Sequence, residues 1–149
     1  MKKIITPAVI LLLFTITTRA QILTPVHWSY GAKKISKDEA VIFIKATIDD
    51  GWHVYSQFVK DGGPVKTTIT FPASPAYSLI GKTIEPTPII RNEKVFNMDV
   101  SFFEHEVIFQ QKIKLKAGEA TVKGTLEYMT CNDRQCLPPD DIDFSVPVK

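Results

Sequence analysis

Short runs of β-branched and other apolar residues, cut by proline and glycine, constrain the fold of this chain most. The most regular run is EVIFQQKIKL at residues 106–115, in which apolar and polar side chains largely alternate. One side carries Val107, Phe109, Ile113 and Leu115, the other carries Gln110, Lys112 and Lys114, and Ile108 and Gln111 are the exceptions. Alternation with a period of two is typical of a strand with one buried face.

Further runs of the same kind extend along the chain. AVIFIKATI at residues 40–48 is almost continuously apolar and predicts a strand buried on both faces. The other predicted strands lie at residues 52–58, 66–71, 121–130 and 142–148. Ser36 to Glu39 matches a helix capping box, but the β-branched residues that follow lose rotamer freedom in a helix. We therefore expect a polar turn there, followed by a strand.

Beyond these six runs, we expect roughly eight short strands in the whole chain, punctuated by proline and glycine, which is typical of an all-β chain. Strands of this length, separated by turn residues, favour an immunoglobulin-like antiparallel β-sandwich. Residues 72–100 contain prolines at positions 72, 75, 86 and 88, so we expect this segment to be partly irregular loop.

The first 20 residues have the pattern of a secretory signal peptide. Lys2 and Lys3 precede a short apolar run, and the segment closes on small residues at Thr18 and Ala20. We predict cleavage after Ala20 and an exported domain at residues 21–149. No later apolar run is long enough to span a bilayer, so stable membrane insertion is not expected.

The charge of the predicted mature chain is nearly balanced. Without Lys2, Lys3 and Arg19, the 18 basic residues become 15, against 16 acidic ones. No cluster of Lys and Arg follows one strand or turn, so we do not expect nucleic acid as a partner.

The two cysteines of the chain, Cys131 and Cys136, enclose the turn-forming residues NDRQ. A metal site needs three or four ligands, and the three histidines show no ligand spacing, so we expect no metal and no cofactor. A structural disulfide across so short a loop would contribute only about 2 kcal/mol. Alternatively, an exposed turn would present both sulfurs to a partner thiolate, which favours thiol–disulfide exchange.

The segment around the cysteines resembles a known family, the N-terminal periplasmic domain of the bacterial thiol:disulfide interchange protein DsbD. In that family a strand with Tyr-x-x-Cys leads to a turn, a second cysteine and a Pro-Pro pair. The matching residues are Tyr128, Cys131, Cys136, Pro138 and Pro139. DGWHVYSQ at residues 50–57 resembles a second family motif, and the likeness extends from about Val26 to Val148.

The resemblance implies a function and a set of partners. The family domain takes electrons from a membrane thiol reductase through a thioredoxin-like domain. It passes them to oxidised periplasmic thioredoxin-fold proteins, including disulfide isomerases and cytochrome c maturation factors. The resemblance thus implies a periplasmic component of a protein-disulfide reductase system. Because the chain ends at Lys149, we expect it to meet its electron donor as a separate protein.

The resemblance also implies roles for individual residues. Cys136 would form the mixed disulfide with partners, and Cys131 would resolve it. Phe96 would lie on a cap loop and shield the disulfide, or it would be an ordinary core residue in a loop. Tyr55 and His53 match the strand that lines the site, although either is compatible with simple packing. Where the family often has acidic residues before the cap aromatic, this chain has Lys94 and Val95.

Two other functions remain open from the residues alone. An immunoglobulin-like binding module would use the disulfide only to stiffen a loop, with Trp28, Trp52 and Tyr55 as a recognition patch. A chaperone-like interaction domain would not need either cysteine. We expect thiol–disulfide exchange because the cysteine pair lies within the family-like segment.

Overall fold

The computed structural model describes residues 22–149, so the predicted signal peptide lies outside the described residues. This part of the chain contains eleven strands and no helix that could cross a membrane. The strands are β1 (Val26–Lys34), β2 (Glu39–Ile48), β3 (Trp52–Tyr55), β4 (Thr68–Thr70), β5 (Tyr77–Ile84), β6 (Ile89–Glu93), β7 (Met98–Phe103), β8 (Glu106–Leu115), β9 (Ala120–Tyr128), β10 (Thr130–Asn132) and β11 (Asp140–Val148).

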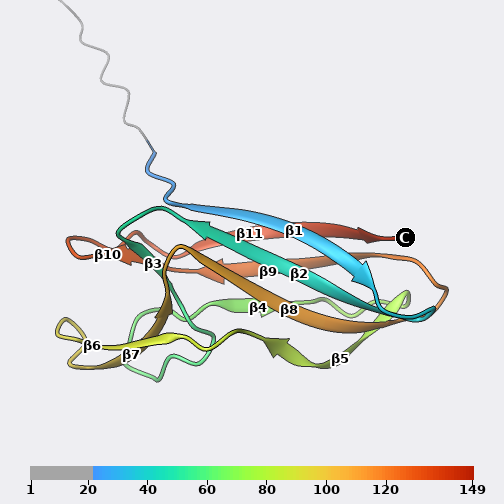
Figure 1. Cartoon of the computed structure of the whole chain (residues 1–149), viewed down its shortest axis with the longest axis horizontal. Helices are drawn as coiled ribbons and strands as arrows, with labels where there is room; N and C mark the ends of the chain where they lie inside the picture. Colours follow the sequence, from blue (N-terminus) through green and yellow to red (C-terminus); the bar gives the residue numbers. More distant parts are fainter. Residues whose placement is uncertain (1–21) are drawn as a thin grey trace, which may run out of the picture.

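The strands form three antiparallel sheets (Figure 1). Two of them, with strand orders β1-β2-β8-β5 and β11-β9-β4, enclose the main hydrophobic core. The third has the order β10-β3-β7-β6 and lies at one end of the molecule (Figure 1). The prediction of an all-β, immunoglobulin-like sandwich is confirmed.

Strand β8 follows the alternation seen in its sequence. Val107, Phe109 and Ile113 are almost completely buried, and so is the polar exception, Gln111, at 1% exposure. The Gln111 amide donates to the carbonyl oxygens of Ile80 and Lys112, and its own oxygen accepts from the Thr83 hydroxyl. A buried amide is tolerated because its hydrogen bonds are made inside the protein.

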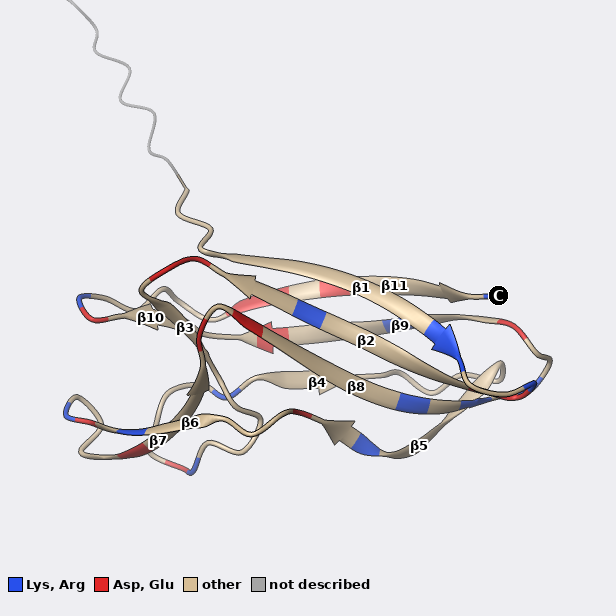
Figure 2. Ribbon diagram, in the orientation of Figure 1, with Lys and Arg blue, Asp and Glu red and all other residues tan. Residues whose placement is uncertain are grey.

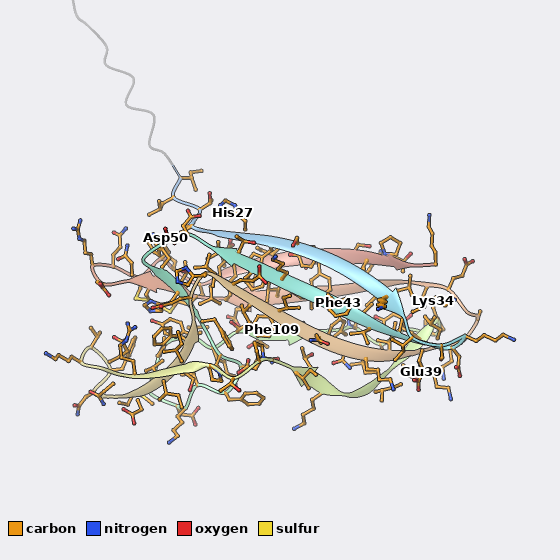
Figure 3. The ribbon with its side chains drawn as sticks, in the orientation of Figure 1. His27, Lys34, Glu39, Phe43, Asp50 and Phe109 are labelled. Atoms are coloured by element: carbon orange, nitrogen blue, oxygen red, sulfur yellow. A yellow bond between two sulfur atoms is a disulfide. The ribbon has the colours of Figure 1, made fainter. Side chains whose placement is uncertain are left out.

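Strand β2 is buried on one face, and the expectation of two buried faces was wrong. Alternate residues such as Ile42 and Ile44 are completely buried, while Val41 and Phe43 on the other face are half-buried. Only one face of sheet β1-β2-β8-β5 meets the main core, so the apolar side chains of the other face rest on the sheet surface. Figure 3 labels Phe43 and the core residue Phe109.

The turn predicted before β2 is confirmed. The Ser36 hydroxyl oxygen accepts hydrogen bonds from the backbone N–H groups of Asp38 and Glu39, at 3.3 and 3.0 Å. These contacts close the turn, and β2 begins directly at Glu39.

The proline-rich segment is more regular than we expected. Residues 77–84 form β5 and residues 89–93 form β6, with Pro86 and Pro88 in the link between them. Strand β6 is the edge of its sheet, and its residues Ile89 and Ile90 are exposed at 44% and 67%. Prolines in the link leave the strand ladders intact, which is why they do not prevent strand formation.

The two faces of sheet β10-β3-β7-β6 belong to different apolar clusters. Trp52, Val54 and Phe103 enter the main core. The other face carries a second cluster, which we call the cysteine cluster. Its buried members are Tyr55, Val100, Phe102 and Cys131, and the half-buried residues Val59, Phe96, Met98 and Met129 pack against them. Successive side chains of a strand point to opposite faces, so one short sheet serves both clusters.

Candidate functional site

Cys131 and Cys136 form a disulfide at the end of the molecule where β10 lies (Figure 1). Their sulfur atoms are 2.03 Å apart and their Cα atoms 4.0 Å apart. Cys131 belongs to β10, and Cys136 lies opposite it in an isolated antiparallel bridge after the turn.

The turn between the cysteines is organised by Asn132. Its side-chain oxygen accepts from the backbone N–H groups of Arg134 and Gln135, both at 2.9 Å. Its own backbone N–H donates to the Gln135 carbonyl, also at 2.9 Å. Asparagine commonly folds a turn in this way, so the prediction of a turn-forming linker is confirmed.

The two cysteines differ strongly in exposure. Cys131 is 2% exposed, because β10 pairs with β3 and the cysteine cluster packs over it. Cys136 is exposed. The expectation that the turn would present both sulfurs was therefore wrong for Cys131. A thiolate from a partner needs access to the sulfur that it attacks, so Cys136 is the accessible member of the pair.

His53 lies directly opposite Cys131 in the pairing of β3 with β10. The imidazole is 5% exposed, and its ring centre lies 4.8 Å from that of Phe102. Its Nε2 atom is 3.1 Å from the hydroxyl oxygen of Tyr55, which is 1% exposed. The structure thus brings together Cys131, His53 and Tyr55, three of the residues singled out from the sequence.

Burial sets the ionisation of this pair. Removal from water lowers the pKa of His53 below its ordinary value. Burial, with a smaller contribution from the negative charge of Glu93, raises the pKa of Tyr55 to about 12. Both side chains are therefore neutral at neutral pH.

Phe96 lies in the turn that joins β6 to β7. Its backbone N–H donates to the Glu93 carbonyl at 3.1 Å, and Asn97 adopts a left-handed conformation with φ of 51°. The Phe96 ring is half-buried against the cysteine cluster, whereas the neighbouring Val95 is 86% exposed. The turn therefore holds the Phe96 side chain against the cluster and leaves that of the preceding residue, Val95, in solvent.

Charged groups of both signs surround the site. Each of the two turns near it, β6–β7 and the cysteine turn, carries acidic and basic residues (Figure 2). Arg91 of β6 lies 4.8 Å above the Phe102 ring centre and is 3.3 Å from Glu104. Within residues 22–149, no group of His, Cys, Asp and Glu could hold a metal ion.

Sequence reasoning missed three residues of this site. Phe102 and Arg91 reach it only through the pairing of β7 with β3 and β6, which no local pattern encodes. Asn132 had a local signal, because asparagine at the end of a strand favours a side-chain-closed turn.

Comparison with known proteins shows the family of the chain. The chain matches the family model described as thiol:disulfide interchange protein DsbD, N-terminal, over residues 19–147. No curated protein matches the chain.

Three solved structures share the fold. The reduced N-terminal domain of DsbD from Neisseria meningitidis has 17% identity and a TM-score of 0.55, over 81% of this chain and 85% of that one. The complex of the DsbD and PilB N-terminal domains from the same species has 18% identity and a TM-score of 0.56, over 84% of this chain and 87% of that one. The N-terminal periplasmic domain of ScsB from Proteus mirabilis has 20% identity and a TM-score of 0.55, over 80% of this chain and 44% of that one. Because the family model spans most of its length, the chain belongs to the family of DsbD N-terminal domains, whose members carry out thiol–disulfide exchange.

Proposed function

We propose that this protein is an exported carrier of reducing equivalents, taking them from a membrane thiol reductase system and passing them to oxidised exported proteins. The observation that carries this proposal is a disulfide with one exposed and one buried cysteine, in a chain of this family. A purely structural disulfide has no need of an accessible sulfur, whereas exchange requires one.

The asymmetry of the pair supports the following order of steps. In the dithiol form, the Cys136 thiolate attacks the partner's disulfide and forms a mixed disulfide, releasing the partner's second sulfur as a thiolate. Cys131 then attacks the sulfur of Cys136, and the electron pair of the mixed disulfide leaves with the partner. The partner gains two electrons and the Cys131–Cys136 disulfide forms. The electron donor restores the dithiol by the reverse sequence.

The partners we propose are proteins of the thioredoxin fold. A DsbD N-terminal domain from Neisseria meningitidis has been captured in complex with the PilB N-terminal domain, which supports domain-to-domain docking in this family. We propose a thioredoxin-like domain or the membrane reductase itself as donor. The acceptors would be oxidised periplasmic proteins, including factors of cytochrome c maturation. Cleavage of residues 1–20 would deliver residues 21–149 to the periplasm.

Trapping of the mixed disulfide tests this function. A Cys131→Ala variant keeps Cys136 but cannot resolve the intermediate, so it should accumulate a covalent adduct with a purified, oxidised thioredoxin-fold protein. Non-reducing electrophoresis and mass spectrometry would detect the adduct and show its loss on treatment with reductant. Cys136→Ala is the matched control, and it should form no adduct because its remaining cysteine is buried. Equal adduct from both variants, or none from either, would contradict the proposal.

We further propose that Phe96 shields the disulfide until a partner displaces the β6–β7 turn. The ring packs against the cluster that contains Cys131, and the backbone hydrogen bonds of its turn, from Phe96 to Glu93 and from Asn97 to Lys94, are local to the turn. Replacing Phe96 with alanine should speed reduction of the disulfide by dithiothreitol severalfold, because it would open the buried Cys131 side of the disulfide to attack in addition to the exposed Cys136.

Quenching with a maleimide that shifts the protein's mobility would measure this rate. Val95→Ala is the matched control, because Val95 lies in the same turn but points away from the cluster. If both variants react at the wild-type rate, Phe96 does not act as a shield.

A further inference from the structure

We propose that His53, held in place by Tyr55, accepts the proton of Cys131 when Cys131 resolves the mixed disulfide, and returns it when the disulfide is reduced. His53 is thus a positioned acid–base residue for the buried cysteine. This inference rests on the proposed exchange function and adds to it a pH control of one defined step.

The need for a base follows from the burial of Cys131. A thiolate is the nucleophile in exchange, and burial in apolar surroundings disfavours it relative to the thiol. Cys131 is 2% exposed, and the buried side chains around it are Tyr55, Val100 and Phe102. Exposed Cys136 can ionise in contact with water, but Cys131 cannot rely on water to take its proton.

The geometry offers one suitable acceptor. His53 is directly opposite Cys131 on the adjacent strand, and paired residues of antiparallel strands project to the same face. Its hydrogen bond to Tyr55 uses Nε2 and leaves Nδ1 for another partner. The Tyr55 hydroxyl can donate to or accept from Nε2, so it keeps the ring oriented in both protonation states.

The surrounding charges are compatible with this role. Burial and Arg91 of β6 lower the pKa of His53, while Glu93 of β6, Glu104 after β7 and Asp133 of the cysteine turn raise it. Burial outweighs the three carboxylates, so the ring is neutral at neutral pH and can accept a proton. The same carboxylates stabilise the imidazolium that then forms. Tyr55, with a pKa of about 12, is neutral throughout and is not the acceptor.

The step balances without another reactant. The proton of the Cys131 thiol passes to His53 while the sulfur's electron pair forms the bond to Cys136. The bond between Cys136 and the partner's sulfur breaks, and its electron pair leaves on the partner as a thiolate. His53 afterwards loses its proton to water. In the reverse direction, the imidazolium protonates Cys131 as it leaves the disulfide.

A disulfide reagent that releases a coloured thiolate can separate attack by Cys136 from resolution by Cys131. The full-length mature protein, reduced and then mixed with dithiobis(nitrobenzoate), should release one coloured thiolate as Cys136 attacks and a second as Cys131 resolves the adduct. The first phase depends on reagent concentration and the second does not. Cys131→Ala should give only the first phase.

His53→Gln should slow the second phase at pH 7 by about a hundredfold, a typical contribution of a positioned acid–base group, and leave the first phase unchanged. In the wild type, the second-phase rate should rise with pH and level off once the imidazole is neutral. Because the pKa of His53 is lowered from 6.5, the midpoint of this rise should lie below pH 6.5. In His53→Gln it should keep rising into the alkaline range, as the thiol itself ionises. Tyr55→Phe should slow the same phase by a smaller factor.

His27→Gln is the matched control, because His27 is an exposed histidine of β1 and should leave both phases unchanged. An unchanged second phase in His53→Gln, or equal slowing of both phases, would overturn the role of His53 while leaving the exchange function intact. Absence of a first phase in the wild type would instead remove the exchange function. Urea unfolding of each variant identifies any change that comes from lost stability alone.

Discussion

A Phe109→Ala variant is expected to lose about 3–5 kcal/mol of its free energy of unfolding. Phe109 lies in the middle of β8 and is completely buried. Its ring centre lies 6.3 Å from that of Trp28 and 6.0 Å from that of Phe103, so it joins strands from two different sheets. Alanine would leave a cavity that these rings cannot fill. Since small domains are stable by only about 5–15 kcal/mol, urea unfolding followed by circular dichroism should show the loss directly.

Phe43→Ala is the matched control for this prediction. It deletes the same atoms from β2, but from the half-buried face of the sheet rather than from the main core. Phe43→Ala should therefore lower the free energy of unfolding clearly less than Phe109→Ala does. Equal losses in the two variants would contradict the assignment of the core to one face of sheet β1-β2-β8-β5.

A Gly124→Ala variant is expected to lose about 1–3 kcal/mol through overpacking. Gly124 lies in β9, between β11 and β4. A Cβ atom there would lie 2.8 Å from the carbonyl oxygen of Thr70 and 2.9 Å from Cε1 of Phe144. The ring of Phe144 can move, but the carbonyl belongs to the backbone of β4, so β4 would have to shift. The same urea assay measures the effect.

Gly31→Ala makes the same change on β1 without a clash. Apart from Gly31 and its two chain neighbours, no atom of residues 22–149 lies within 4 Å of the added Cβ, so the variant should be as stable as the wild type or slightly more stable. If Gly124→Ala were equally harmless, the close approach of β4 to β9 would be wrong.

The sequence was sufficient for those strands whose burial follows a local rule. Strand β8 was predicted with its bounds because its side chains alternate over ten residues, and the polar exception Gln111 was visible in the same pattern. The turn at Ser36 was also predictable, since β-branched residues after it excluded the helix that a capping box favours. The family-like segment around Cys131 and Cys136 pointed to the candidate site, and the structure joins these two cysteines in a disulfide.

Long-range pairing decided the features that the sequence did not predict. Strand β6 has little buried surface of its own, and it exists because β7 pairs with it along its whole length. The burial of Cys131 depends on a register with β3, 78 residues earlier in the chain. The local composition around the cysteines predicts an exposed polar turn. This prediction is right for the turn itself and for Cys136, but not for the buried Cys131.

The hydrogen bond between His53 and Tyr55 depends partly on a local pattern and partly on long-range pairing. Two residues apart on a strand, they had to face the same side, and this could be read from the sequence. That this side would be the one shared with Cys131 required the β3–β10 pairing.

The division of β3 between two clusters has a consequence for how members of this family can diverge. Trp52 and Val54 anchor the scaffold, whereas His53 and Tyr55 set the surroundings of the sulfurs. We therefore expect conservative substitutions at the second pair, such as Tyr55→Phe, to change the surroundings of the disulfide without changing the main core, whereas truncation of the buried Tyr55 would also cost stability. A laboratory selection for altered electron-transfer speed should therefore favour size-conserving changes at these two alternate positions of the four-residue strand.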